Sequence, residues 1–398
     1  MPDLIKVRAE IQTAAVGEAT RLIIPRWTLF SRIKYFIFAY FWKALSKLEL
    51  YHSELKRIFS SPGENEPDKI KSYPVRKFLK IRIFFPPSYD PAACSHGKTA
   101  QTKLPTLLTC HGGGFMVGEA RDNDAWNRTF AKRHGFLVVA LDYTKTPRAP
   151  FPTALRDIEA LVGCVLSDPS LPVDTTRVAV TGWSAGGNLV LAATQLPSLR
   201  GRIRAAIPFY PLVDFVPGYE AKAKGRRYKP TLGGFRSNEN DFLLRMIGLF
   251  DWGYLHPGQR CDDPLLSPYY ASPGDLPPNI FLIGCELDML AHEAWRMACK
   301  LAGKKVPALD EAVGREGVAG KGELITEGDE RFAWEETTEN GSRYRWLLVP
   351  DMVHGFDHGT IEGIAKDPVM MEDARIKTAK VIDLIGEWLL SGPLKAES

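Results

Sequence analysis

The hydrophobic pattern is regular from about residue 79 onward, where short apolar, β-branched runs alternate with longer segments of helical spacing. The short runs predict strands at 79–85, 104–110, 136–143, 177–183, 203–210, 279–284 and 344–350. The longer segments predict helices at 123–134, 152–167, 186–195, 288–302 and 369–391. The strands are apolar on both faces, as in a parallel sheet that helices cover on both sides. The sequence therefore predicts an α/β class with a mostly parallel, doubly wound sheet.

Two long stretches interrupt this alternation. Residues 212–270 contain a basic loop, "AKAKGRRYKPTLGG", followed by an apolar helical pattern, "DFLLRMIGLFDWGYL". We expect this stretch to form a lid or cap over the carboxyl edge of the sheet. Residues 303–343 are rich in glycine and glutamate, which predicts an excursion on the surface.

A densely aromatic segment, "RWTLFSRIKYFIFAYFWKALSKL", occupies residues 26–48 near the N-terminus. Its longest uncharged run is Tyr35 to Trp42, whereas a helix that spans a bilayer needs about 20 apolar residues. The segment therefore either packs over the core and lines a pocket, or lies in a membrane interface. Peripheral membrane contact through residues 26–48 stays open on the sequence alone.

Composition and charge narrow the function classes. A hydrophobic content of 45% and a charged content of 25% are typical of a soluble globular protein with a full core. The net charge is only +4, but residues 1–82 contain 16 Lys and Arg against 8 Asp and Glu. This excess either attracts an anionic membrane surface or simply solvates a helical arm. No nucleic-acid motif accompanies it, so we expect no nucleic-acid partner.

The cysteines predict free thiols rather than a disulfide framework. The six cysteines are far apart and mostly lie in apolar segments such as "LLTC" and "LIGC", and no spacing fits a zinc site. We therefore expect no metal and no other cofactor. The N-terminus lacks a basic region followed by an apolar stretch, so we expect a cytoplasmic protein, with peripheral membrane contact as the alternative.

The pentapeptide Gly182-Trp183-Ser184-Ala185-Gly186 fits the pattern G-x-S-x-G. A predicted strand, "RVAVT", precedes it and a predicted helix, "GGNLVLAATQL", follows it. Such a turn holds the serine in a strained conformation with its hydroxyl exposed, and the glycines allow close backbone packing. Ser184 is therefore the candidate nucleophile, with a purely structural tight turn as the alternative.

A serine hydroxyl needs a base to take its proton. His354, in "LLVPDMVHGFDH", follows a predicted strand and precedes Gly355, while His358 is a neighbouring competitor. A carboxylate must then hold the imidazole tautomer, and "NIFLIGCELDML" offers Glu286 and Asp288 directly after another strand. We favour Asp288, although it could instead cap the following helix.

Donors for a developing oxyanion are predicted at "TCHGGGFMVG". His111, Gly112, Gly113 and Gly114 follow the predicted strand 104–110, and consecutive glycines free backbone N–H groups to point at one oxygen.

With these motifs in this order, the sequence resembles the hormone-sensitive-lipase-like branch of the α/β-hydrolases, which includes arylacetamide-deacetylase-like and bacterial carboxylesterases. The resemblance covers about residues 80–300 and 344–390, including "DYTKTPRAPFPTALRDIEA", "FYPLVD", "LSPYYA" and "VPDMVHGF". It implies an α/β-hydrolase fold with a helical cap. It also implies site residues of two kinds: a triad of Ser184, Asp288 and His354, and oxyanion donors at Gly113, Gly114 and Ala185, with His111 and Gly112 in support.

The resemblance further implies an organisation for the chain. An N-terminal helical arm (1–75) would contribute to the cap of a catalytic domain (76–398), with a cap insertion at about 212–262 and the excursion at about 303–343. The branch usually has aspartate directly before the serine, where this chain has Trp183. We expect Trp183 to pack beside the turn and to alter either the shape of the pocket or the support of the turn.

These features predict a carboxylic ester hydrolase that acts on small, largely apolar molecules through an acyl-enzyme. One alternative uses the same triad for acyl transfer or cyclisation in a biosynthetic pathway. Another is a non-catalytic small-molecule receptor, because the plant gibberellin receptors resemble this fold with a disabled triad. The expected partner is a small-molecule ester, and the sequence indicates no oligomeric state.

Overall fold

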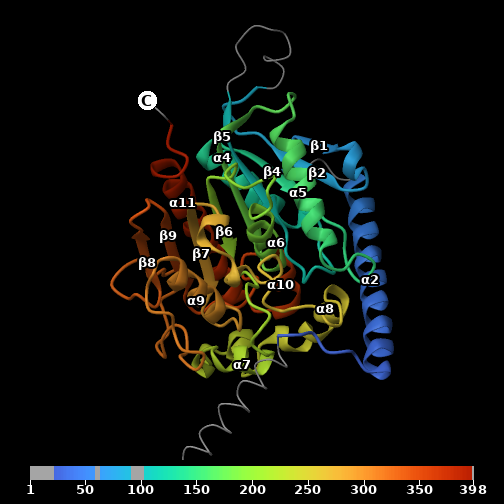
Figure 1. Cartoon of the computed structure of the whole chain (residues 1–398), viewed down its shortest axis with the longest axis vertical. Helices are drawn as coiled ribbons and strands as arrows, with labels where there is room; N and C mark the ends of the chain where they lie inside the picture. The colour runs from blue at the N-terminus through green and yellow to red at the C-terminus, as the bar shows by residue number, and fades with distance from the viewer. Residues whose placement is uncertain (1–21, 59–62, 91–102, 397–398) are drawn as a thin grey trace, which may run out of the picture.

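The computed structural model describes residues 22–58, 63–90 and 103–396 (Figure 1). Their strands form a single sheet in the order β1-β2-β4-β3-β5-β6-β7-β9-β8. The six central strands β4, β3, β5, β6, β7 and β9 pair in parallel, while β1, β2 and β8 run antiparallel at the two sides. The strands are β1 (Lys69–Ser72), β2 (Lys80–Phe84), β3 (Leu104–Cys110), β4 (Leu137–Leu141), β5 (Val173–Trp183), β6 (Ala205–Phe209), β7 (Asn279–Cys285), β8 (Ala333–Thr337) and β9 (Arg343–Val349).

Helices cover both faces of this sheet because both faces of its central strands are apolar. On one face, α5, α6 and α9 contribute Leu155, Leu189 and Met297 to one buried cluster. On the other face, α4 and α11 contribute Phe130 and Ile385 to a second cluster. These covering helices are α4 (Asp124–His134), α5 (Thr153–Leu166), α6 (Ala185–Thr194), α9 (Ala291–Leu301) and α11 (Pro368–Ser391). The predicted doubly wound, mostly parallel α/β fold is confirmed.

Every predicted strand and every helix predicted after residue 79 is present, with ends shifted by a few residues. Two antiparallel strands were not predicted. β1 has the sequence KIKS and is largely exposed, so it lacks the apolar signal of a strand. β8 lies within the predicted excursion and pairs with β9, burying Ala333 and Trp334. The excursion thus contributes an edge strand to the sheet, besides its surface loops.

The elements outside this core are the segment 212–262, the short helix before α11 and the long helix near the N-terminus. Residues 212–262 contain α7 (Tyr219–Lys224), α8 (Ile247–Tyr254) and several short 3-10 turns, and α10 (Gly359–Ala365) lies nearby in the chain leading to α11. The long helix α2 (Leu29–Ile58) runs along one side of the molecule and packs on α8 (Figure 1). Residues 1–21 of the predicted arm lie outside the described residues.

None of the helices in the described part of the chain is long and apolar enough to cross a membrane. Cys110, Cys164, Cys261, Cys285 and Cys299 are free thiols, as expected, while Cys94 lies outside the described residues.

Candidate active site

Ser184 lies in the sharp turn between β5 and α6, with φ 54° and ψ −117°. The flanking glycines are required by close backbone approach. A Cβ on Gly182 would lie 2.4 Å from the Gly186 carbonyl oxygen, and a Cβ on Gly186 would lie 2.2 Å from the Cys110 carbonyl oxygen. The backbone N–H of Ser184 donates to the Phe209 carbonyl at 2.9 Å. The motif therefore holds the serine in a conformation that side chains rarely adopt, wedged between β3 and β6.

The glycine-rich loop after β3 lies beside this turn. Gly113 and Gly114 have φ angles of 101° and 57°, and a Cβ on Gly113 would lie 2.3 Å from the Val117 carbonyl oxygen. Within the described residues, the amides of Gly113, Gly114 and Ala185 donate to no protein acceptor. Ala185 is also the first residue of α6, where backbone N–H groups have no partner inside the helix. Three free donors are thus available near Ser184.

The side chains of His111 and Tyr143 both contact the backbone of this loop. The His111 Nδ1–H donates to the Gly112 carbonyl at 2.7 Å, and its Nε2 lies 3.1 Å from Asp142 Oδ1. The Tyr143 ring stacks on the His111 ring, and its hydroxyl donates to the same Gly112 carbonyl at 2.9 Å. Burial and the nearby Lys145 charge lower the pKa of His111, and they outweigh the opposing effect of Asp142.

His354 and Asp288 are brought together from two separate loops. The His354 Nδ1–H donates to Asp288 Oδ2 at 2.7 Å, and Asp288 is fully buried. Burial opposes protonation of His354, but the charge and the hydrogen bond of Asp288 outweigh it and raise the pKa of the imidazole. Asp288 also accepts a hydrogen bond from the Leu290 amide just before α9, so its local role in the turn coexists with its contact to His354.

The competing candidates lie elsewhere. Glu286 accepts from the buried Lys229 ammonium at 2.8 Å, rather than from His354. The His358 Nε2 lies 4.0 Å from Asp122 Oδ2.

Among the described residues, the Ser184 hydroxyl forms no hydrogen bond with His354. The two residues are linked through neighbouring residues of the chain: the His354 ring packs on Tyr210, and the Ser184 amide donates to the carbonyl of Phe209, which directly precedes Tyr210. A hydrogen bond between a serine and its base is often long in a protein without its substrate.

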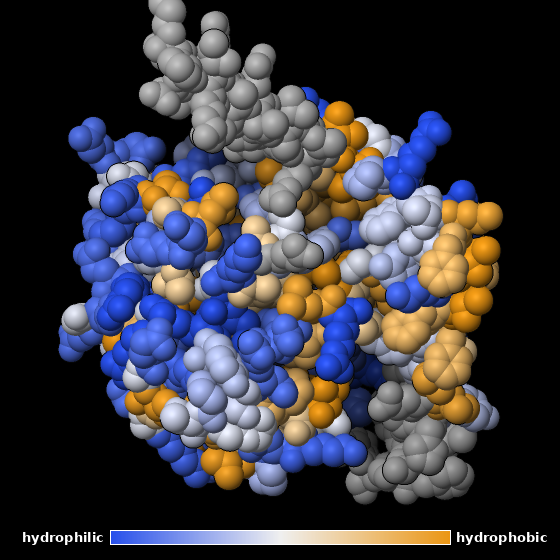
Figure 2. Space-filling model, turned by 90° about the horizontal axis from the view of Figure 1, so that it is seen from below, coloured by the Kyte–Doolittle hydropathy of each residue, from blue (hydrophilic) through white to orange (hydrophobic). Residues whose placement is uncertain are grey.

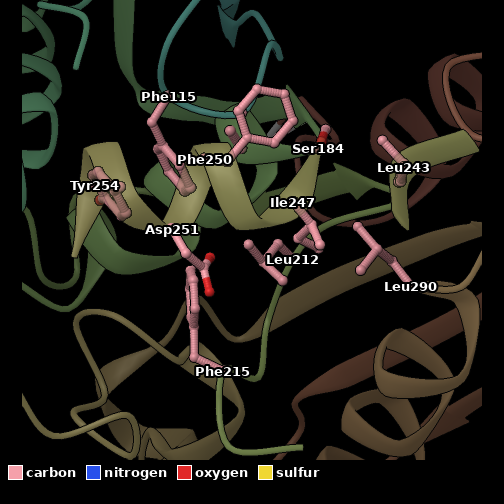
Figure 3. A pocket seen from close by; sticks show the side chains of 12 residues that line it. Phe115, Ser184, Leu212, Phe215, Leu243, Ile247, Phe250, Asp251, Tyr254 and Leu290 are labelled. Carbon is pink, nitrogen blue, oxygen red and sulfur yellow. The ribbon is translucent and has the colours of Figure 1, made fainter. Parts of the chain in front are cut away.

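An apolar cavity opens beside Ser184 (Figure 3). Its volume is about 30 Å³, which leaves room for roughly one or two water molecules. Asp251 contributes the one carboxyl group among the described residues that line it; burial raises the pKa of this carboxyl to about 7, and the Tyr219 hydroxyl donates to it. The walls come from the glycine-rich loop, the serine turn and the segment 212–262: Gly114, Phe115, Ser184, Ala185, Leu212, Phe215, Leu243, Ile247, Phe250, Asp251, Tyr254 and Leu290.

The sequence pattern of a family described as alpha/beta hydrolase fold matches residues 107–314. The chain belongs to this family. An arylesterase of Saccharolobus solfataricus is 29% identical over 62% of this chain and 74% of its own length. An ethyl acetate hydrolase of Pseudomonas putida is 34% identical over 34% of this chain and 41% of its own. Arylacetamide deacetylase-like 2 of Homo sapiens is 30% identical over 37% of this chain and 36% of its own.

The last two matches thus span less than half of each relative. The fold is also that of an esterase from Pyrobaculum calidifontis, with a TM-score of 0.59 and 20% identity over 88% of this chain and 94% of that one. The resemblance to the hormone-sensitive-lipase-like branch is confirmed.

Trp183 occupies the position directly before the serine, where the hormone-sensitive-lipase-like branch usually has aspartate. It is buried, stacks on Phe209 at 5.4 Å and meets Trp126 edge-on. Its Nε1–H donates to Asp357 Oδ2 at 2.8 Å, and the Tyr210 hydroxyl donates to the other oxygen of Asp357 at 2.5 Å. Trp183 packs beside the turn, as expected, but it does not line the cavity. Its position fits support of the turn.

Trp183→Phe keeps most of this packing but removes the donor to Asp357. Because burial raises the pKa of Asp357 against the effect of its two donors, losing one donor leaves a poorly solvated carboxyl. We expect the free energy of unfolding to fall by about 1–3 kcal/mol, measured by urea denaturation. Trp388→Phe is the matched control, because its Nε1–H donates at 3.1 Å to Glu335, whose side chain is partly exposed. Equal losses in the two variants would contradict a special role for Asp357.

Proposed function

We propose that the protein hydrolyses carboxylic esters of small, largely apolar molecules through an acyl-enzyme on Ser184. The observation that carries the proposal is the shared location of its parts: Ser184, Gly114 and Ala185 all border one apolar cavity. The hydrogen-bonded pair of His354 and Asp288 adds a base whose orientation is fixed. The names of the relatives, an arylesterase and an ethyl acetate hydrolase among them, support the same chemistry.

In the first half of the reaction, the Ser184 hydroxyl attacks the ester carbonyl carbon while His354 takes its proton. Asp288 holds the imidazole so that Nε2 is the atom free to accept, and it stabilises the imidazolium that forms. The negative charge that develops on the carbonyl oxygen is stabilised by the amides of Gly113, Gly114 and Ala185. His354 then returns the proton to the departing alcohol, which leaves the acyl group on Ser184.

In the second half, water takes the place of the alcohol. His354 removes a proton from the water, the hydroxide oxygen attacks the acyl carbon, and the carboxylic acid leaves as Ser184 regains its proton. No metal ion or organic cofactor enters any of these steps.

The lining of the cavity supports an apolar acyl or alcohol group. Leu212, Leu243 and Ile247 supply aliphatic surface, and Phe250 and Tyr254 supply aromatic surface. Ile247, Phe250, Asp251 and Tyr254 place α8 in the wall of the cavity. The substrate class therefore depends on the space that these side chains leave beside Ser184.

A fluorophosphonate probe tests the nucleophile directly. We expect one covalent adduct per chain, located on Ser184 by peptide mass spectrometry, together with hydrolysis of p-nitrophenyl acetate. Ser184→Ala should lose both, while Ser198→Ala should keep both because Ser198 is exposed and hydrogen bonds to Glu159. An adduct that persists in Ser184→Ala, or one that maps to another residue, would overturn the proposal.

A further inference from the structure

Helix α2 presents an apolar stripe to solvent. Large side chains recur every three or four residues along the stripe, and between 49% and 78% of each is exposed: Phe30, Ile33, Ile37, Phe41, Leu45 and Leu48. In the space-filling view, hydrophobic residues gather along the right-hand edge, on the side where α2 runs in Figure 1 (Figure 2). We call these six residues the outer stripe.

The inner face of α2 is already occupied. Ala39 is fully buried against Leu249 and Met116, and the Trp42 ring packs on the Phe250 ring at 6.0 Å. A surface helix in a soluble protein normally has one apolar face, turned toward the core, and a polar face toward water. Here the helix is apolar on both sides. An exposed apolar surface of this kind marks a site of interaction.

The charged residues around the outer stripe indicate which kind of partner it binds. Between residues 22 and 48 the chain contains no Asp or Glu, and its charged residues are Arg26, Arg32, Lys34, Lys43 and Lys47. The side chains of Arg32, Lys34 and Lys47 are exposed. Lys43 instead turns inward and donates to the Thr146 carbonyl. Pairing with a second copy of α2 would bring like charges together, whereas an anionic lipid surface complements both the stripe and its basic flanks.

We propose that α2 docks on anionic phospholipid, lying in the plane of the interface with the outer stripe among the upper acyl chains. The aromatic and aliphatic stripe supplies the apolar contact, and the lysines and arginines meet the headgroups. The helix does not span the bilayer. Because α2 packs on α8, docking brings this wall of the cavity close to the lipid. The proposal concerns the surface alone and stands whether or not Ser184 is a nucleophile.

Flotation with phospholipid vesicles tests the surface. We expect the full chain to float with vesicles that contain phosphatidylserine, and to float less with pure phosphatidylcholine or at high salt, because salt screens the charges. Ile37→Glu combined with Phe41→Glu places two acids in the outer stripe and should reduce the bound fraction at least about tenfold. The matched control combines Leu309→Glu with Val369→Glu, since these side chains are 51% and 68% exposed and belong to the segment 303–343 and to α11 instead of α2.

The control should bind vesicles like the unchanged protein. Circular dichroism of both double variants checks that each is folded. The proposal is overturned if the unchanged chain does not float with phosphatidylserine vesicles, or if the Ile37 and Phe41 variant floats as well as the control. It is also overturned if light scattering shows a dimer that this variant converts to a monomer, because a second copy would then cover the stripe.

Discussion

His354→Ala is expected to lower kcat for p-nitrophenyl acetate by about 10⁶-fold, leaving only the slow reaction that binding and the oxyanion donors still support. The reason is that an unassisted serine hydroxyl is a weak nucleophile, and among the described residues His354 is the imidazole that Asp288 orients. The measurement is steady-state turnover, with unfolding curves to show that the variant is folded.

His358→Ala is the control for this change. His358 is the neighbouring histidine that the sequence left as a competitor, and the structure places its ring near Asp122. It should keep turnover within a few-fold of the unchanged protein. If the His358 variant loses activity and the His354 variant retains it, the assignment of the base is wrong.

The activity should also depend on pH through the protonation of His354. The base must be neutral to accept a proton, and the Asp288 charge and hydrogen bond, acting against burial, raise the pKa of His354 above its ordinary value of 6.5. Activity should therefore be full at high pH and fall as the pH drops through that raised value. Asp288→Asn removes the charge, so the acid limb should move to lower pH while kcat falls by about 10⁴-fold.

Lys229→Met is expected to lower the free energy of unfolding by about 3–5 kcal/mol, because it leaves buried carboxylates without their cation. The Lys229 ammonium lies 2.8 Å from Glu286 Oε2 and 2.7 Å from Asp351 Oδ1, and all three side chains are almost completely buried. It also donates to the Gly317 carbonyl at 2.7 Å. Urea denaturation measures the loss.

Lys321→Met is the control, since its ammonium is largely exposed and lies 3.8 Å from Glu372. It should change stability by no more than about 0.5 kcal/mol. A Lys229 variant as stable as this control would mean that water or another cation replaces the ammonium. Glu286 follows β7 and Asp351 follows β9, so Lys229 ties the loops of Asp288 and His354 to the segment 212–262. Lower activity in the folded variant would be consistent with this link.

The sequence could predict what local pattern determines. The strand, glycine turn and helix around Ser184 are consecutive in the chain, and so are β3 and the glycine-rich loop, so their geometry follows from neighbouring residues. The sequence also favoured Asp288 over Glu286 as the partner of His354. It could not predict the contact that Glu286 makes instead, because the distant Lys229 supplies it across 57 residues of chain.

The edge of the sheet and the N-terminal helical arm show a second limit of prediction from local sequence. β8 has only two buried residues and is stabilised by pairing with β9, which a local hydrophobic pattern does not reveal. For residues 26–48, the sequence left core packing and membrane contact as alternatives. The structure shows that Ala39 and Trp42 pack inward while Phe30 and Phe41 face outward. Core packing and an exposed apolar face therefore occur on opposite sides of the same helix.

The contact between Gly114 and Phe250 has a consequence for how this protein can evolve. A Cβ on Gly114 would lie only 2.5 Å from the Phe250 ring, so the aromatic side chain occupies the space that a larger residue would need. Because Gly114 also has a φ of 57°, a larger residue there would be strained even without this contact. Among descendants of this chain, we therefore expect Gly114 to stay glycine. An α8 taken from another protein should fit only if its residue at position 250 leaves space for the loop.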